Sequence, residues 1–169
     1  MSAVQAPTWA EAGLELLDGL VAKAIVAIMG MMVAIVSAQV ALRYGLNDSI
    51  DWADEISRLC FVWSIFLAIP LGIKRGAHIG IELLTMHLPE RVQSVLYRAM
   101  TLLSAVLMGL IAIEAFVLTR DQWDELMPTV NASAAWFMVP IWFGAAHSIL
   151  HLLRLAARGA PVKHSAITE

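Results

Sequence analysis

The sequence predicts an all-α integral membrane protein, a single domain of four transmembrane helices. Of its 169 residues, 60% are hydrophobic and 15% are charged, and the mean hydropathy is +0.75. Soluble domains are typically about 45–50% apolar and about 25% charged, so this chain is far more apolar than they are. Its longest apolar stretches approach the roughly 20 helical residues that cross a bilayer core. The 11 basic residues form no positive face, so nucleic acid is not an expected partner.

The N-terminal residues are expected to form an amphipathic helix that leads into the first span. Thr8 and Glu11 have the spacing of a capping box. Acids form one helical stripe and apolar residues form another: Glu11, Glu15 and Asp18 on the first, and Leu14, Leu17 and Val21 on the second. The first basic residue is Lys23, so the basic start of a secretory signal is missing and we expect the N-terminus to be retained.

The four spans are predicted at about residues 22–43, 54–74, 94–118 and 129–153. The second span ends where Lys74 follows the apolar run. The third comes after Pro89, and proline is favoured at the first position of a helix. Pro140 lies near the middle of the fourth stretch, where we expect it to kink the helix.

Another helix, at about residues 77–88, is expected to lie in the plane of the membrane between spans two and three. The segment is too short and too polar to cross. His78, Glu82 and Thr85 share one helical face, while leucines and isoleucines cover most of the rest, as is typical of an interfacial helix. After the fourth span only a short tail remains, at about 155–169, which we expect in the cytoplasm.

Loop charge predicts that both termini face the cytoplasm, because positively charged loops are retained there. In this orientation eight basic residues are cytoplasmic: Lys23, Lys74, Arg75, Arg91, Arg98, Arg154, Arg158 and Lys163. Three remain outside: Arg43, Arg58 and Arg120. The outer loops are acidic instead, with Asp48, Asp51, Asp54 and Glu55 in one and Asp121, Asp124 and Glu125 in the other.

Two groups of side chains could carry chemistry inside the membrane. His147 and His151 are four residues apart and could bind a metal ion or a haem, yet two histidines at the inner end of a span more often lie at the interface. Glu114 is an acid within an apolar run and could carry a proton. Snorkelling near Arg120, or a hydrogen bond to a neighbouring helix, is the more common explanation for such an acid.

The sequence contains none of the motifs that mark an enzyme or a self-sufficient transporter. There is no phosphate-binding loop, nucleophile elbow, HExxH or cofactor fingerprint. The single cysteine, Cys60, excludes an internal disulfide and a cysteine-built metal site. We therefore expect a protein that is not an enzyme, binds no cofactor or metal of its own and supports a partner. A stripe of small residues on the first span is expected to pack on another helix, in this chain or in a partner: Gly30, Ala34, Ala38 and Ala41.

Residues 54–82 resemble the core signature of the small membrane subunit of TRAP transporters, the DctQ-like family. That signature has an acidic pair with an arginine a turn later, a tryptophan and a phenylalanine inside the span, and then a basic residue, a glycine and a histidine before an acidic segment. The residues in these places, our candidates for structural or partner contacts, are Asp54, Glu55, Arg58, Trp63, Phe66, Arg75, Gly76, His78 and Glu82. Pro70 and Gly72 depart from the small-residue stretch that is more usual there.

The resemblance implies a tripartite importer in a bacterial or archaeal inner membrane. In such a system a periplasmic protein captures a substrate, usually an organic acid, and a large multi-span subunit imports it with sodium. The small subunit braces the immobile part of the large one, so sodium is expected at the large subunit and not on this chain. The acidic residues of the outer loops are candidates for transient docking of the binding protein: Asp48, Asp121, Asp124 and Glu125.

The charged start of the second span leads to a prediction about Arg58. Asp54 and Glu55 fall in the first helical turn, where the helix dipole favours acids. Arg58 follows them by four and three residues, so we expect it to pair with a carboxylate and also to reach another helix or a partner. The main rival interpretation is a haem- or quinone-binding anchor of a respiratory enzyme, with His147 and His151 among the ligands. A third is a small proton-coupled exporter that uses Glu114.

Overall fold

The computed structural model describes residues 9–74 and 89–158, and these residues form four long helices and one short 3-10 helix. The elements are α1 (Trp9–Gly45), α2 (Ala53–Lys74), α4 (Glu90–Asp121), η1 (Ala134–Phe137) and α5 (Val139–Arg158). All four long helices have a segment that is long and apolar enough to cross a membrane, which confirms the predicted all-α class and the number of spans. The interfacial helix predicted at 77–88, and the tail beyond residue 158, lie outside the described residues.

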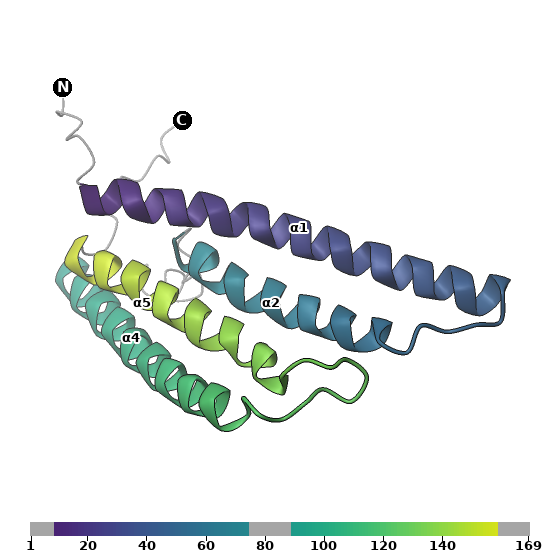
Figure 1. Ribbon diagram of the computed structural model, residues 1–169. Coiled ribbons are helices and arrows are strands. Elements are labelled where there is room, and N and C mark those ends of the chain that lie inside the picture. Colours follow the sequence, from purple (N-terminus) through teal and green to yellow (C-terminus); the bar gives the residue numbers. More distant parts are fainter. Residues whose placement is uncertain (1–8, 75–88, 159–169) are drawn as a thin grey trace, which may run out of the picture.

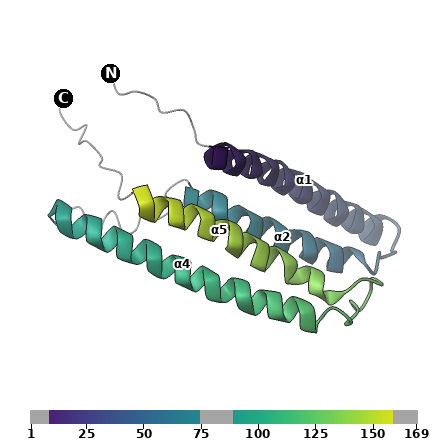
Figure 2. The same cartoon turned by 60° about the vertical axis from the view of Figure 1, so that its left-hand side comes forward.

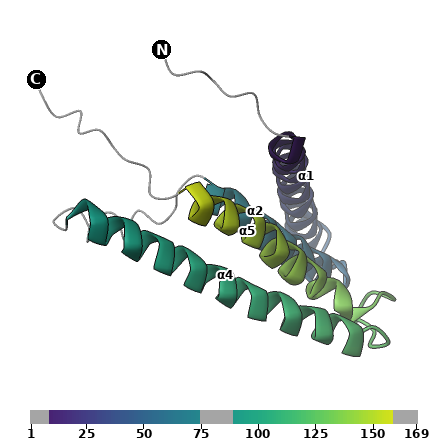
Figure 3. The same ribbon diagram turned by 90° about the vertical axis from the view of Figure 1, so that its left-hand side faces the viewer.

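The long helices form a row in the order α1, α2, α5, α4 and not a closed bundle (Figures 1 and 2). α2 and α5 lie in the middle of the row, so each has a helix on both sides. α1 and α4 are at its edges, and α1 is strongly inclined to α4 when the molecule is viewed from its end (Figure 3). This arrangement gives a broad, flat protein whose two edge helices leave much of their surface uncovered.

α1 is one continuous helix of 37 residues, and it combines the predicted amphipathic segment with the first span. At 1.5 Å per residue it is about 55 Å long, well beyond a hydrocarbon core of about 30 Å. Its N-terminal half is where the structure differs from expectation. Asp18, which we placed on a polar stripe with Glu15, is buried together with Val21, whereas Glu15 is exposed.

The stripe of small residues on α1 finds no partner among the helices of this chain. All four residues, Gly30, Ala34, Ala38 and Ala41, are exposed within the described part of the molecule. A Cβ added at Gly30 would meet no atom within 4 Å. The face of α1 that packs on α2 is instead formed by larger, half-buried side chains such as Ile28 and Ile35.

The fourth span begins later than predicted, and Pro140 does not kink it. The chain crosses from α4 through a loop to η1, where the Ser133 hydroxyl accepts a hydrogen bond from the backbone nitrogen of Ala135 at 3.1 Å. α5 then begins at Val139, so Pro140 occupies the first helical turn. A proline is tolerated there because nitrogens of the first turn have no partner within the helix.

Candidate functional site

In the middle of the row, the backbones of α2 and α5 are in close contact. At Gly144 on α5, an added Cβ would overlap the carbonyl oxygen of Phe66 on α2. Small residues allow such an approach between membrane helices, whose association depends on packing and hydrogen bonds because lipid is as apolar as the side chains. Trp63, one turn before Phe66, donates its indole N–H to the carbonyl of Trp136 at 3.1 Å. Two of the signature residues on α2 therefore contact the α5 side of the row.

Several buried hydroxyls along these helices are satisfied within their own helix, whereas the hydroxyl oxygen of Ser57 on α2 is buried without a partner. Ser64 donates to the carbonyl of Cys60 at 2.9 Å, and Ser148 donates to that of Gly144 at 2.7 Å. Thr101 on α4 does the same with Tyr97 at 2.8 Å. Such bonds to the carbonyl four residues earlier are a common way to bury serine and threonine in a helix. These side chains need no partner and carry no evident chemistry.

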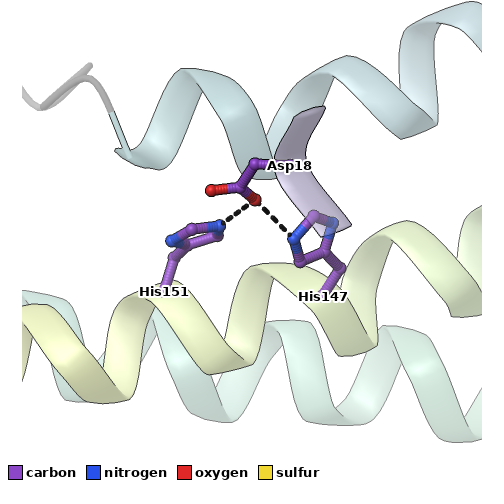
Figure 4. A group of neighbouring side chains, drawn as sticks. All are labelled: Asp18, His147 and His151. Carbon is purple, nitrogen blue, oxygen red and sulfur yellow. Dashed lines mark hydrogen bonds and ion pairs between the residues drawn. The ribbon is translucent and has the colours of Figure 1, made fainter. Parts of the chain in front are cut away.

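A polar cluster joins three helices at one end of the molecule, and Figure 4 shows its three buried side chains, Asp18, His147 and His151. Asp18 of α1 lies between His147 and His151 of α5, and its Oδ1 is 2.9 Å from the Nε2 of each. Its other oxygen, Oδ2, is 2.7 Å from the ammonium of Lys74, the last residue of α2. The exposed fractions are only 5% for Asp18, 3% for His147 and 2% for His151, while the Lys74 side chain is 40% exposed.

Both carboxylate oxygens of Asp18 are satisfied by hydrogen bonds. A carboxylate has no hydrogen to give, so each Nε2 donates to Oδ1 and Lys74 donates to Oδ2. The Nδ1 of His147 is buried without a partner. The same three side chains also present atoms of the types that bind metals, and the ligand atoms of Asp18, His147 and His151 lie within 4.8 Å of one another.

The sequence did not predict this cluster. The two histidines, which the sequence left as either interfacial residues or ligands, are both buried, and both contact Asp18 of α1. The carboxylate that they contact is 129 and 133 residues away, so no local spacing in the sequence predicts the contact. One signal was present, because Asp18 follows Leu14 by four residues and precedes Val21 by three. This spacing places an acid on the apolar face of the helix.

At the opposite end of the helices, where α2 begins, Glu55 contacts the loop that connects α4 to η1. Glu55 is 3% exposed, and its Oε2 accepts hydrogen bonds from the backbone nitrogen of Thr129, at 2.9 Å, and from the Thr129 hydroxyl. The loop is also closed by its own backbone, since Met127 donates to Ala132 at 2.8 Å. Glu55 was predicted as a structural residue in the first turn of the second span, and α2 does begin at Ala53.

Arg58 does not form the ion pair that its spacing predicts. Within residues 9–74 and 89–158, no ion pair joins Arg58 to Asp54 or Glu55, and its guanidinium lies 5.7 Å from the ring centroid of Phe137. Glu55 points instead to Thr129. The expected contact of Arg58 with another element is thus a cation–π contact with η1.

The remaining candidate residues are separated from both polar contacts. Asp54 is exposed, and so are the four acids considered for docking: Asp48, Asp121, Asp124 and Glu125. Glu114 is exposed on α4. Four of the signature residues lie outside the described part of the chain: Arg75, Gly76, His78 and Glu82.

Comparison with known families decides the identity of the chain. The model of the family described as "Tripartite ATP-independent periplasmic transporters, DctQ component" matches residues 32–161, more than three quarters of the chain. The chain belongs to this family. The match includes the C-terminal part of α1, from residue 32 onward, and all of α2, α4 and α5, and the recognised DctQ-like signature lies within it. Asp18 precedes the matched residues, whereas Lys74, His147 and His151 lie inside them.

This DctQ-family protein is similar to several curated transporter proteins. It is 26% identical over 129 residues to the sialic acid TRAP transporter small permease protein SiaQ of Vibrio cholerae, which covers 76% of this chain and 74% of the relative. It is 37% identical over 65 residues to the C4-dicarboxylate TRAP transporter small permease protein DctQ of the same organism, covering 38% and 28%. A segment of the sialic acid TRAP transporter permease protein SiaT of Haemophilus influenzae is 28% identical over 68 residues, covering 40% of this chain and 10% of that protein.

Proposed function

We propose that this DctQ-family protein is the scaffold subunit of a sodium-coupled importer of organic acids, and that it braces a large permease in a bacterial inner membrane. The observation that carries the proposal is the family match, which covers α2, α4, α5 and the C-terminal part of α1. Its buried polar groups fit this role. Asp18 and Glu55 each link segments that are far apart in the sequence, as a supporting subunit requires.

The expected partner is a large multi-span permease. The SiaT relative contains a segment similar to this chain that makes up a tenth of its length. This similarity supports a link between a chain of this kind and a larger permease. In our proposal the two functions are divided between separate chains that meet in the membrane. The broad row of helices with uncovered edges offers lateral surface for such a contact.

The transport chemistry is assigned to the partner. The relatives carry the names of two substrates, sialic acid and C4-dicarboxylate, and both are organic acids. We propose that this importer takes the same chemical class, that the sodium ions bind the large permease, and that a periplasmic binding protein delivers the substrate. A haem- or quinone-binding anchor is not favoured, because the relatives are transport subunits and both histidines contact Asp18.

Co-expression with the large permease of the same genome tests the proposal. We expect the two chains to purify as one complex and, in proteoliposomes with the binding protein, to take up an organic acid only under an inward sodium gradient. Omission of this chain should abolish or strongly reduce uptake. Transport by this chain alone, or purification of a fully active permease without it, would overturn the scaffold role. Uptake driven equally well by a potassium gradient would overturn sodium coupling while leaving the scaffold role intact.

Docking of the binding protein on the outer acids is a second element of the proposal. Asp48, Asp121, Asp124 and Glu125 are exposed, as a docking surface requires. Reversing these four charges to lysine should lower the rate of uptake at low salt and weaken its dependence on ionic strength, since exposed charges mainly affect association rates. A variant with Glu15 reversed, an exposed acid near the other end of the row, serves as the control. An unchanged rate and salt dependence would rule out this docking surface.

A further inference from the structure

We propose that Asp18, His147 and His151 form a binding site for a zinc ion that links α1 to α5. The inference concerns this chain alone and does not depend on its role in transport. It starts from Figure 4, in which one carboxylate oxygen and two imidazole nitrogens converge from two helices. All three ligand atoms lie within 4.8 Å of one another, and all three residues are buried.

The donor set suits zinc. Two imidazoles and one carboxylate are ligands that Zn²⁺ binds at about 2.0–2.1 Å, with a fourth position left for water. In a tetrahedron of such bonds, neighbouring ligand atoms are about 3.3 Å apart. The 2.9 Å from each Nε2 to Oδ1 would have to open by roughly 0.4 Å, and the three ligand atoms, which lie within 4.8 Å of one another, would have to close around the ion.

Helical spacing holds the ligands in place. His147 and His151 are one turn apart on the same face of α5, the spacing that lets two histidines share one metal ion. Asp18 meets them from the neighbouring α1. Sites built on helices are positioned more rigidly than sites on loops, so the three donors are arranged before an ion arrives.

Lys74 is the cation that bonds Asp18 in the described part of the chain, and its position is compatible with zinc. It bonds Oδ2, so it leaves Oδ1 free to become a ligand, and it orients the carboxylate as an outer partner of a metal ligand does. Its side chain is 40% exposed, so the ammonium can turn toward solvent if zinc is bound. Repulsion between the two cations is relieved without breaking the site.

The two histidines are not equivalent in this proposal. When zinc takes Nε2, the remaining hydrogen of each ring sits on Nδ1 and needs an acceptor. The Nδ1 of His147 is buried with no partner, whereas the Nδ1 of His151 is not among the buried unpaired atoms of the described residues. We therefore expect His151 to be the stronger ligand.

Direct metal binding to the purified full-length chain tests the proposal, with Zn²⁺ alone as the probe. After removal of metals with a chelator, we expect one zinc ion to bind per chain in competition with a chromogenic chelator, and the thermal unfolding temperature to rise with zinc concentration. Cobalt(II) added in place of zinc should give the strong visible absorption of a tetrahedral site. Absence of one-to-one binding, or only the weak absorption of octahedral cobalt, would overturn the proposal.

Matched variants separate a metal site from a hydrogen-bonded cluster. Asn or Gln at these positions can still form hydrogen bonds but is a poor zinc ligand. Asp18→Asn and His151→Gln should each lower zinc affinity at least tenfold, and His147→Gln should lower it less than His151→Gln. Glu15→Gln, an exposed acid on the same helix, should leave it unchanged.

If all four variants bind zinc like the wild type, the ion sits elsewhere and the three residues form a hydrogen-bonded cluster only. If one of these variants fails to fold, the remaining ones still locate the ion, because Asp18→Asn, His147→Gln and His151→Gln each remove a single ligand.

Discussion

One buried carboxylate lies near each end of the long helices, Asp18 at one end and Glu55 at the other, but the two contacts differ in what they join. Asp18 joins three helices, with His147 and His151 of α5 on one oxygen and Lys74 of α2 on the other. Glu55 joins a helix to a loop through the nitrogen and hydroxyl of Thr129. The Asp18 end therefore holds an edge helix in place, while the Glu55 end fixes only the path of a connection. Their loss should have different consequences.

The largest effect is expected from Asp18→Ala. The substitution leaves two buried imidazoles without their acceptor, and removal of one partner from a buried polar pair costs about 3 kcal/mol of unfolding free energy. Unfolding of the purified chain in mild detergent measures it. Glu15→Ala removes an exposed acid from the same helix and should change stability by less than about 0.5 kcal/mol. Equal effects of the two variants would show that the cluster does not stabilise the fold.

The next effect is expected at the middle of the row. In Gly144→Ala the new Cβ overlaps the backbone oxygen of Phe66, which cannot rotate away, so α2 and α5 must separate. Overpacking of this kind typically costs about 1–3 kcal/mol. Gly109→Ala on α4 is the matched control, because a Cβ there meets no atom within 4 Å. Unfolding temperatures of the two variants give the comparison, and a Gly144→Ala protein as stable as Gly109→Ala would contradict the close contact.

A smaller and more local effect is expected from Glu55→Ala. The nitrogen and hydroxyl of Thr129 lose their acceptor, which costs about 1–2 kcal/mol, less than at Asp18 because the loop can turn toward water. Hydrogen exchange should become faster in the loop around Thr129 and stay unchanged in α1. Asp54→Ala, an exposed acid one residue earlier, should leave exchange in the loop unaltered. Faster exchange spread over all helices would show that Glu55 is as central as Asp18.

The smallest effect on the isolated chain is expected from Arg58→Ala. Its cation–π contact with Phe137 contributes about 0.5–1 kcal/mol. Assembly is the more informative measurement, because an arginine at the start of a span also has donors available for a partner. Arg58→Ala should lower the yield of complex with the large permease more than Arg43→Ala, an exposed arginine at the end of α1. Equal yields would mean that Arg58 serves only the contact with η1.

The sequence predicted the elements better than the contacts between them. Long apolar runs identify spanning helices because lipid forces the backbone to satisfy its own hydrogen bonds. The start of the fourth span was wrong, since the residues from 129 to 133 form a loop held by Glu55. The kink at Pro140 was wrong for the same reason, because the helix begins one residue before it. The local sequence gives the hydrophobicity of a stretch, but it does not show that a side chain from another helix will hold part of that stretch in a loop.

The partner of Arg58 shows why local spacing is a weak guide to pairing. Its distance from Asp54 and Glu55 along the helix favours an ion pair. In the folded chain Glu55 is taken by two donors of the loop, and a ring of η1 becomes available to Arg58. The choice between a partner on the same helix and one from a distant segment therefore depends on the tertiary structure.

By itself the sequence determined that this chain lies in a membrane, that it has four spans and that it carries the DctQ signature, because these properties depend on composition and on residues close together in the chain. Only the tertiary structure decided which face of α1 is covered and which residues meet Asp18. Those contacts join positions 56 to 133 residues apart, and helix packing sets their geometry. Neither the acid on the edge helix nor the two histidines of α5 indicate a site by themselves, but in the folded chain both histidines lie 2.9 Å from one oxygen of Asp18, and together they form a buried cluster that links two helices.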